Sequence, residues 1–196
     1  MPELSLDPQR TAVLCMDYQA GIVANFAAGG EAMLARAAGL LATARAVKAS
    51  VIYVVVGFRP GFPEVSPRNK SFSTIRDRAA MFAGEGAQVH PAVAPQPGDV
   101  TVTKHRVGAF LGTDLEMLLR AKDIDTLVLF GIATSGVVLS TVRYAADADY
   151  RLVVVRDCCA DGDPEVHAVL VDKVFQRQTT VVTASEVLQA LGGAKA

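Results

Sequence analysis

Three features that could take part in chemistry follow apolar runs of the sequence. Asp17 follows one such run, Lys104 follows a second, and a turn of small residues at 131–136 follows a third. A carboxylate can transfer protons, an ammonium can stabilise negative charge, and the backbone N–H groups of a tight turn can bind an anion. In an open α/β sheet, ligands bind beyond the carboxyl ends of the strands. We therefore expect Asp17, Lys104 and the turn to meet at one edge of a sheet.

The apolar runs predict a sheet of six strands. They are short, rich in β-branched residues and bounded by turn residues, as strands buried on both faces are. The runs cover 12–16, 51–56, 100–103, 126–130, 152–155 and 179–182. Helical segments separate most of them, and in 31–48 one helix face carries Met33, Leu34, Ala37, Leu41 and Ala44. This alternation predicts a three-layer, doubly wound α/β fold with a six-stranded parallel sheet.

Three later helices have recognisable first turns. Two have the spacing of a capping box, in which the side chains of the N-cap residue and of the third helical residue bond each other's backbone N–H groups. The third has an aspartate before a first-turn proline. The residues are Thr113 with Glu116, Thr183 with Glu186, and Asp163 with Pro164.

Composition limits the class of protein. The 196 residues fit one domain over 1–196, and a net charge of −1 argues against nucleic acid or a membrane surface as a partner. Hydrophobic residues make up 51% of the chain and the mean hydropathy is +0.32, which indicates a homo-oligomer, a dimer or larger, that hides apolar surface. The long irregular stretch 57–99 is rich in Gly and Pro, and loops of that length serve as lids or oligomer contacts. We expect it at the oligomer interface.

The expected location is the cytoplasm. The N-terminal residues lack the basic and apolar regions of a signal peptide. Residues 126–142 carry no charge, but glycines and hydroxyl side chains divide them into strand, turn and helix, so we expect no membrane span. The three cysteines, Cys15, Cys158 and Cys159, form neither a disulfide framework nor a zinc motif, and we expect them to be reduced thiols.

The sequence resembles the isochorismatase-like hydrolase family, also called the cysteine hydrolase family, in three segments: AVLCMDYQ, TKHRVGAF and LVLFGIATSGVVLSTVRYAAD. The resemblance extends from residue 11 to about 190. It implies the strand order 3-2-1-4-5-6, with Asp17 and Lys104 as site residues at the carboxyl edge of the sheet. Most members have a nucleophilic cysteine shortly after a Gly-x-Ala-Thr turn, and here Val137 takes its place. The resemblance also implies a non-proline cis peptide between Ile132 and Ala133.

Without the thiol, the resemblance implies a hydrolase that forms no covalent intermediate. Isochorismatases proper also lack the cysteine, and they hydrolyse a vinyl ether that an aspartate is thought to protonate. Asp17 would then be the acid/base and Lys104 would stabilise negative charge, while the N–H groups of Ala133 and Val137 would form an anion hole. Lys104 lowers the pKa of Asp17 and burial raises it, so the balance decides whether Asp17 can donate a proton near neutral pH.

Two other functions stay open. The first is a degenerate family member that binds a small molecule without turnover, in which Asp17 and Lys104 form only a structural salt bridge. The second is a dinucleotide-binding oxidoreductase. It is disfavoured because the first strand is followed by MDYQAGI rather than by the Gly-x-Gly-x-x-Gly motif.

We expect a pocket for a small-molecule substrate beside the turn. Six residues are candidates to line it: Tyr18, Phe26, Arg59, Phe110, Thr134 and Ser135. A capping or turn role explains Ser135 more simply than catalysis, because no histidine falls in a matching motif. The histidines stand in separate segments, at His90, His105 and His167, and no Asp-x-His motif follows the second strand. We therefore expect neither a metal nor a cofactor.

Overall fold

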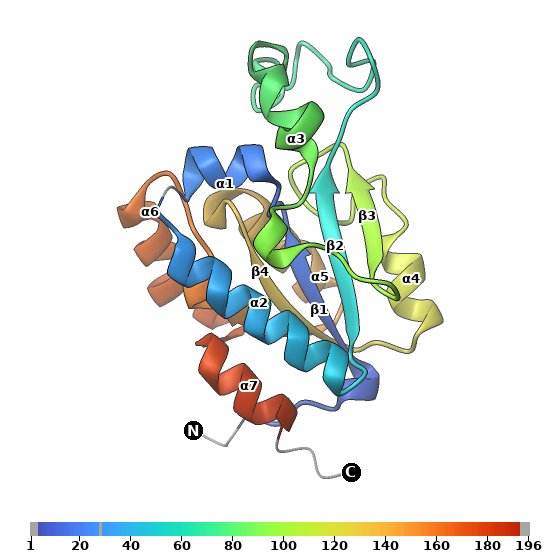
Figure 1. Cartoon of the computed structure of the whole chain (residues 1–196), viewed down its shortest axis with the longest axis vertical. Helices are drawn as coiled ribbons and strands as arrows, with labels where there is room; N and C mark the ends of the chain where they lie inside the picture. Colours follow the sequence, from blue (N-terminus) through green and yellow to red (C-terminus); the bar gives the residue numbers. More distant parts are fainter. Residues whose placement is uncertain (1–3, 28, 193–196) are drawn as a thin grey trace.

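The computed structural model describes residues 4–27 and 29–192. Its centre is a six-stranded parallel sheet with the order β3-β2-β1-β4-β5-β6, which confirms the predicted fold class and strand order (Figure 1). Each strand begins and ends within one residue of its predicted run. The strands are β1 (Thr11–Met16), β2 (Ser50–Val56), β3 (Val100–Lys104), β4 (Thr126–Gly131), β5 (Arg151–Val155) and β6 (Thr180–Val182).

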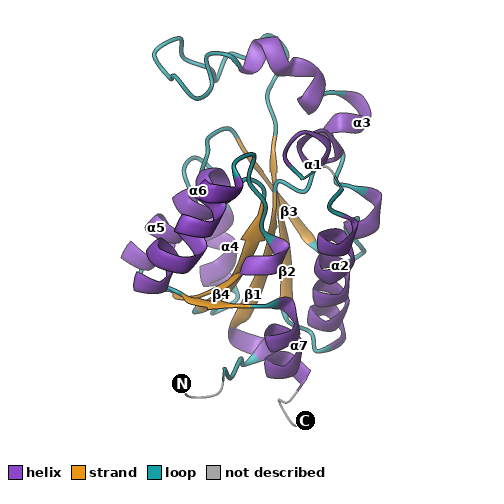
Figure 2. Cartoon of the chain, turned by 90° about the vertical axis from the view of Figure 1, so that its left-hand side faces the viewer, coloured by secondary structure: helices purple, strands orange, loops and turns teal. Residues whose placement is uncertain are grey.

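Helices cover both faces of the sheet. Figure 2 shows α1, α2 and α7 on one face and α4, α5 and α6 on the other. The α-helices are α1 (Ala20–Phe26), α2 (Glu31–Ala46), α3 (Gly84–Ala87), α4 (Leu115–Ala121), α5 (Leu139–Asp147), α6 (Pro164–Val169) and α7 (Ala184–Gly192). Two further segments are π-helical, η4 (Thr134–Val138) and η6 (Leu170–Val174). The 3₁₀ segments are η1 (Pro8–Arg10), η2 (Ile75–Phe82), η3 (Pro91–Val93), η5 (Arg156–Cys158) and η7 (Phe175–Arg177).

Burial follows from the position of each strand in the sheet. Every residue of the central strands β1 and β4 is buried, as a continuous apolar run between two helix layers should be. The edge strand β3 instead alternates, with Thr101 and Thr103 exposed and Val102 and Lys104 buried. The predicted face of α2 is also buried, with Leu40 added to it. The core therefore lies on both sides of the sheet, and its outer strand supplies a buried lysine at one end.

Two of the three predicted helix starts are confirmed. The Asp163 carboxylate accepts hydrogen bonds from the N–H groups of Glu165 and Val166, with Pro164 at the first helical position. Thr183 and Glu186 form the reciprocal capping box, with the Thr183 N–H 2.7 Å from Glu186 Oε2 and the Glu186 N–H 3.4 Å from Thr183 Oγ1. These starts were predictable because each depends only on neighbouring residues.

The capping box predicted at Thr113 and Glu116 is wrong. The Thr113 hydroxyl donates to the carbonyl oxygen of Ala109, and α4 begins two residues later, at Leu115. The Glu116 carboxylate accepts instead from Arg120 on its own helix and from the Tyr144 hydroxyl of α5. A contact with another helix therefore takes the glutamate that the local pattern assigned to the cap.

The stretch 57–99 is less irregular than predicted, because it contains η2, α3 and η3. It leaves the carboxyl end of β2 and rises above the sheet edge before returning to β3 (Figure 1). Gln19, which is buried, secures its return. The Gln19 amide donates to the carbonyl oxygens of Val56 and Ala87, and its oxygen accepts from the Val56 N–H at 2.8 Å. One side chain thus joins the ends of β1 and β2 to α3.

The charge-free stretch 126–142 divides as predicted. It forms β4, the turn that leads into η4, and the first part of α5. Among the helices of residues 4–27 and 29–192, none is long and apolar enough to cross a bilayer.

Candidate active site

Asp17 and Lys104 form an ion pair at the carboxyl edge of the sheet. Lys104 Nζ lies 2.9 Å from Asp17 Oδ2 and donates a second hydrogen bond to the Arg106 carbonyl oxygen at 3.0 Å. The side chain of Lys104 is only 3% exposed and that of Asp17 only 8%. Lys104 ends β3 and Asp17 follows β1, so the two side chains meet across β2. Their contact agrees with the expectation that these strand ends share one edge.

The backbone of Asp17 departs from that of a strand. Its φ is +57°, in the left-handed region that Asp and Asn tolerate better than most residues. Its N–H donates to the Val54 carbonyl oxygen at 2.8 Å, which holds this conformation against β2. The second carboxyl oxygen, Oδ1, is buried without a hydrogen-bond partner in the part of the chain that the structure describes. A buried polar atom without a partner costs roughly 1–3 kcal/mol, so this oxygen favours a ligand that forms a hydrogen bond with it.

Burial dominates the ionisation of Asp17. Desolvation raises its pKa above the ordinary value of 3.8, and the attraction and hydrogen bond of Lys104 offset this only in part. The net direction is upward because water is almost completely excluded from the carboxyl group. Asp17 therefore retains a proton at higher pH than an exposed aspartate, as a general acid must.

The turn after β4 brings backbone donors to the same edge. The Ile132–Ala133 peptide is cis, as the resemblance implied, and η4 follows it. Gly131 makes the close approach to β1 possible, since a Cβ there would lie 2.8 Å from the Met16 carbonyl oxygen. The Ala133 N–H makes no hydrogen bond to the other described residues. This group is therefore free to bind an oxygen atom of a ligand.

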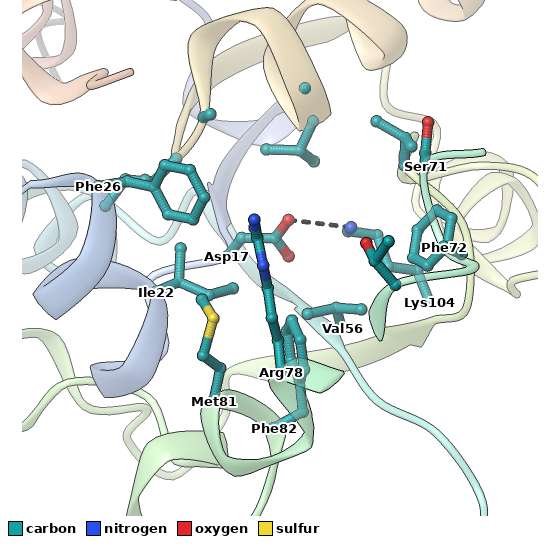
Figure 3. A pocket seen from close by; sticks show the side chains of 16 residues that line it. Asp17, Ile22, Phe26, Val56, Ser71, Phe72, Arg78, Met81, Phe82 and Lys104 are labelled. Carbon is teal, nitrogen blue, oxygen red and sulfur yellow. Dashed lines mark ion pairs between the residues drawn. The ribbon is translucent and has the colours of Figure 1, made fainter. Parts of the chain in front are cut away.

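A pocket of about 180 Å³ joins the ion pair to the turn (Figure 3). This volume is below the range typical of drug-sized ligands, and it suits a small molecule. Its walls are mostly apolar, and its polar groups are concentrated in a few side chains. The lining residues are Asp17, Ile22, Phe26, Val56, Ser71, Phe72, Thr74, Arg78, Met81, Phe82, Lys104, Val107, Ile132, Ala133, Gly136 and Val137.

Of the six candidate pocket residues, Phe26 lines the pocket and the others lie elsewhere. Tyr18 is buried under the sheet edge, where its hydroxyl donates to the Cys158 carbonyl oxygen at 2.6 Å. Phe110 stacks on Tyr144 of α5, with ring centroids 4.4 Å apart. Both aromatic rings are therefore held in the core by partners that are distant in sequence.

The polar candidates are also turned away from the pocket. Arg59 pairs with Glu64 at 2.6 Å, and its side chain is 67% exposed. Thr134 is fully buried behind the turn, and Ser135 is exposed with its N–H bonded to an Asp161 carboxylate oxygen at 2.7 Å. Thr134 and Ser135 therefore hold the turn in place and do not contact the pocket.

Comparison with known proteins agrees with this architecture. Residues 11–186 match the Isochorismatase domain. The chain belongs to the isochorismatase family. It is 32% identical to the isochorismatase family protein YwoC of Bacillus subtilis over 96% of this chain and 98% of that protein. It is 31% identical to the maleamate amidohydrolase of Pseudomonas putida, over 93% of this chain and 87% of that enzyme.

A solved structure shows the same fold in this family. The isochorismatase family protein of Burkholderia thailandensis aligns with a TM-score of 0.82 and 32% identity, over 97% of this chain and 99% of that one. The maleamate amidohydrolase is a hydrolase by name, and the chain is a member of the same hydrolase family.

Sequence reasoning missed the pocket residues of segment 57–99. Ser71, Thr74, Arg78, Met81 and Phe82 all line the pocket but stand in a stretch without strand or helix periodicity. Figure 3 shows the Arg78 side chain extending into the pocket that holds the ion pair. Arg78 forms no ion pair with the residues that the structure describes. The feature that identifies Arg78 is its position in a largely apolar pocket, and this position is known only from the folded chain.

The cysteines of this isochorismatase-family chain lie outside the pocket. Cys15, Cys158 and Cys159 are all buried, and burial raises the pKa of each thiol, that of Cys159 to about 12. A buried thiol with a raised pKa is a poor nucleophile. Val137, at the position where the resemblance places the family cysteine, does line the pocket. The side chain at the family's nucleophile position is therefore an inert isopropyl group.

Metal-ligand groups are not clustered. Among the residues that the structure describes, no three His, Cys, Asp or Glu side chains are placed to hold a metal ion. The three histidines lie apart and contact other groups: His90 accepts from the Ala92 N–H, His105 contacts the Gly57 carbonyl oxygen, and His167 contacts Thr134.

Proposed function

We propose that the chain hydrolyses a small carboxylate without a covalent intermediate, with Asp17 as acid/base. The observation that carries the proposal is the buried Asp17–Lys104 pair, which lies in one pocket with the turn. Burial keeps a proton on Asp17 at higher pH than is usual for an aspartate, so the carboxyl group can give that proton to a substrate. Lys104 stabilises the carboxylate that remains, and the N–H groups of Ala133 and Val137 bind an anionic oxygen.

An enol ether is the functional group whose hydrolysis this set of groups suits best. Asp17 donates its proton to the terminal alkene carbon, and the resulting positive charge is shared with the ether oxygen. Water adds to the cationic carbon and returns a proton to Asp17. The hemiketal then loses the alcohol, which leaves a carbonyl compound and restores the enzyme. One acid suffices for this sequence, so Val137 is not an obstacle, whereas thiol-dependent amide cleavage needs a nucleophile there.

Arg78 supports a carboxylate as the recognised group. It is a cation in the pocket without an acidic partner among the described residues, and its planar guanidinium can bind a carboxylate through two hydrogen bonds. Lys104 already pairs with Asp17, so a second cation that has no acidic partner among the described residues favours an anionic ligand. The maleamate amidohydrolase relative is named for a substrate that carries a carboxylate.

A substrate panel tests the proposal. It contains an enol ether of pyruvate, maleamate and N-carbamoylglycine, each assayed with wild type, Asp17→Asn and the exposed control Asp149→Asn. We expect wild type to hydrolyse the enol ether and Asp17→Asn to lose activity at least about 100-fold, because the proton donor is removed. Reaction in D₂O should place deuterium on the carbon that Asp17 protonates. Hydrolysis that is unchanged in Asp17→Asn would contradict the assigned role.

Binding without turnover is the second candidate, and Val137 favours it because the pocket holds no nucleophilic side chain at that position. In that case the whole panel would remain unhydrolysed, while a carboxylate such as maleate would still bind, as measured by calorimetry. Activity on maleamate alone would instead indicate an amidohydrolase in which Asp17 activates water.

A further inference from the structure

Behind the turn, the side chain of Thr134 joins two elements that the pocket does not include. Its hydroxyl oxygen lies 3.1 Å from the Ala160 carbonyl oxygen and 2.8 Å from His167 Nδ1 of α6. The Thr134 N–H also donates to the Ala160 carbonyl oxygen, at 2.8 Å. Thr134 is fully buried and directly follows Ala133, whose N–H is a proposed anion-binding donor.

The protons of this cluster can be counted. The Ala160 carbonyl oxygen can only accept, so a hydrogen bond at the 3.1 Å contact requires the single hydroxyl proton of Thr134 to point to it. The Thr134 oxygen then presents a lone pair to His167, and His167 Nδ1 must carry a proton to complete the contact. A carbonyl oxygen has two lone pairs, so Ala160 can accept from both the N–H and the hydroxyl group of Thr134. All three contacts are satisfied only with His167 as the Nδ1–H donor.

We propose that His167 is a positioning residue of the active site, which acts through Thr134 to hold the anion-binding turn in its working orientation. Its hydrogen bond fixes the Thr134 side chain, and Thr134 fixes the peptide that follows Ala133. The next residue is also secured from the same side, since the Ser135 N–H donates to Asp161. Because α6 supplies the donor, the turn is fixed relative to the second helix layer as well as to the sheet. This role rests on the proposed function of the turn.

The surroundings of His167 agree with a neutral ring. Burial lowers its pKa, and the nearby Asp161 offsets this only in part. A neutral ring has one N–H, and the contacts of the Thr134 hydroxyl group place that proton on Nδ1. His167 does not line the pocket, so we expect its effect on a reaction to be exerted through the turn.

Three substitutions of His167 separate the effect of its Nδ1–H hydrogen bond from the effect of its side-chain packing. His167→Asn retains an N–H group near the position of Nδ1, whereas His167→Gln places its amide near Nε2 and His167→Ala removes the donor. We expect His167→Asn to keep kcat within about twofold of wild type, and His167→Gln and His167→Ala to lower kcat about tenfold with little change in KM, because a displaced turn aligns the bound substrate poorly with Asp17. His90→Gln, a substitution remote from the turn, is the matched control. Equal loss in His167→Asn and His167→Ala would overturn the proposal.

A readout that needs no turnover keeps the two proposals apart. ¹⁵N NMR of labelled protein distinguishes the histidine tautomers, and we expect the Nδ1–H form for His167. The amide resonances of Ala133 and Val137 should shift in His167→Ala and Thr134→Val and should stay near wild type in His167→Asn. If these signals appear and the substrate panel stays inert, the positioning role stands and the hydrolase proposal fails. An Nε2–H tautomer, or amides that do not respond, would refute the positioning role whatever the activity.

Discussion

At the scale of single residues, two opposing effects determine the ionisation of Asp17. Exclusion of water favours its neutral form, while the ammonium of Lys104 favours the carboxylate. The left-handed backbone at Asp17 turns the side chain out of the strand line, toward the end of β3. A residue in that conformation, with one carboxyl oxygen unsatisfied, carries local cost that the surrounding sheet must offset. Such cost is expected where a side chain serves a bound molecule.

Removing the ammonium tests this balance. In Lys104→Met, the attraction that favours the carboxylate is lost, so the pKa of Asp17 should rise further. A carboxyl group whose folded pKa exceeds its unfolded value stabilises the fold at low pH and loses that contribution as pH rises through the folded pKa. The variant should therefore be closest to wild type in thermal stability at acidic pH and fall behind as pH rises. Carboxyl ¹³C titration measures the pKa directly.

The exposed Lys122→Met is the control for that experiment, and it should leave both the Asp17 titration and the melting temperature unchanged. A Lys104→Met variant whose Asp17 pKa fell, or whose deficit in stability was the same at every pH, would contradict the dominance of burial.

Val137 is the second residue that decides the chemistry. Val137→Cys places a thiol in the pocket near Lys104, where a cation lowers a thiol pKa. We expect iodoacetamide to label this variant at least about tenfold faster than wild type, whose three cysteines are buried with raised pKa values. Val138→Cys is the matched control, because Val138 is buried as Val137 is but does not line the pocket. Mass spectrometry measures the rate of labelling. Equal rates in the two variants would show that the side chain at position 137 does not face the pocket.

At the scale of elements, segment 57–99 completes the pocket by packing on α1. Gly21 makes this packing possible. A Cβ at Gly21 would lie 2.5 Å from the Met81 carbonyl oxygen and 3.0 Å from the Met81 Cα, so the backbone of η2 could not remain in place. Gly21 thereby controls the position of Arg78, Met81 and Phe82, which η2 contributes to the pocket.

Gly21→Ala should displace η2. We expect a loss of roughly 1–3 kcal/mol in the free energy of unfolding from overpacking, faster proteolysis within 57–99, and a higher KM or weaker carboxylate binding. Gly39→Ala is the matched control, because Gly39 lies within α2 with no atom within 4 Å of an added Cβ. That substitution should stabilise the protein by up to about 1 kcal/mol and leave proteolysis and KM unchanged. Identical behaviour of the two variants would contradict the role of Gly21.

These elements also show what could be predicted from sequence. The strands were found because burial on both faces leaves continuous apolar runs, and Asp17, Lys104 and the turn were found because parallel strands end at one edge. Arg78 was missed because its position depends on contact between η2 and Gly21, residues far apart in the chain. The cap at Thr113 failed for the same reason, since Tyr144 of another helix takes Glu116. Sequence patterns therefore predicted the features that depend on neighbouring residues. They did not predict the pocket wall, which depends on contacts between segments far apart in the chain.

At the scale of the whole molecule, apolar side chains gather on the α4–α5 face. Leu111 and Met117 are each 68% exposed, and Tyr144 is 44% exposed and stacked on Phe110. Tyr144 bonds Glu116 of α4, the helix that carries Met117, and stacks on Phe110, the neighbour of Leu111, so the three side chains come from segments in contact. Among the side chains whose burial the structure describes, the large exposed apolar ones lie here and on α6, and none of those described in segment 57–99 is among them. The oligomer expected from the mean hydropathy therefore has better support at the α4–α5 face than at 57–99, the interface expected from the sequence.

Sedimentation velocity over a range of concentrations tests this expectation. We expect wild type to sediment as a dimer or larger, since burial of exposed apolar surface favours association by roughly 25 cal/mol per Å² before the entropic cost of binding. Leu111→Lys combined with Met117→Lys should shift the protein toward the monomer by placing charges in the contact. Val169→Lys, a change at another exposed apolar position on α6, should sediment as wild type does. If the double variant associates as wild type does, the contact lies elsewhere, and charges introduced into 57–99 should then dissociate it. If wild type remains a monomer at every concentration, its high hydropathy reflects only the doubly covered sheet.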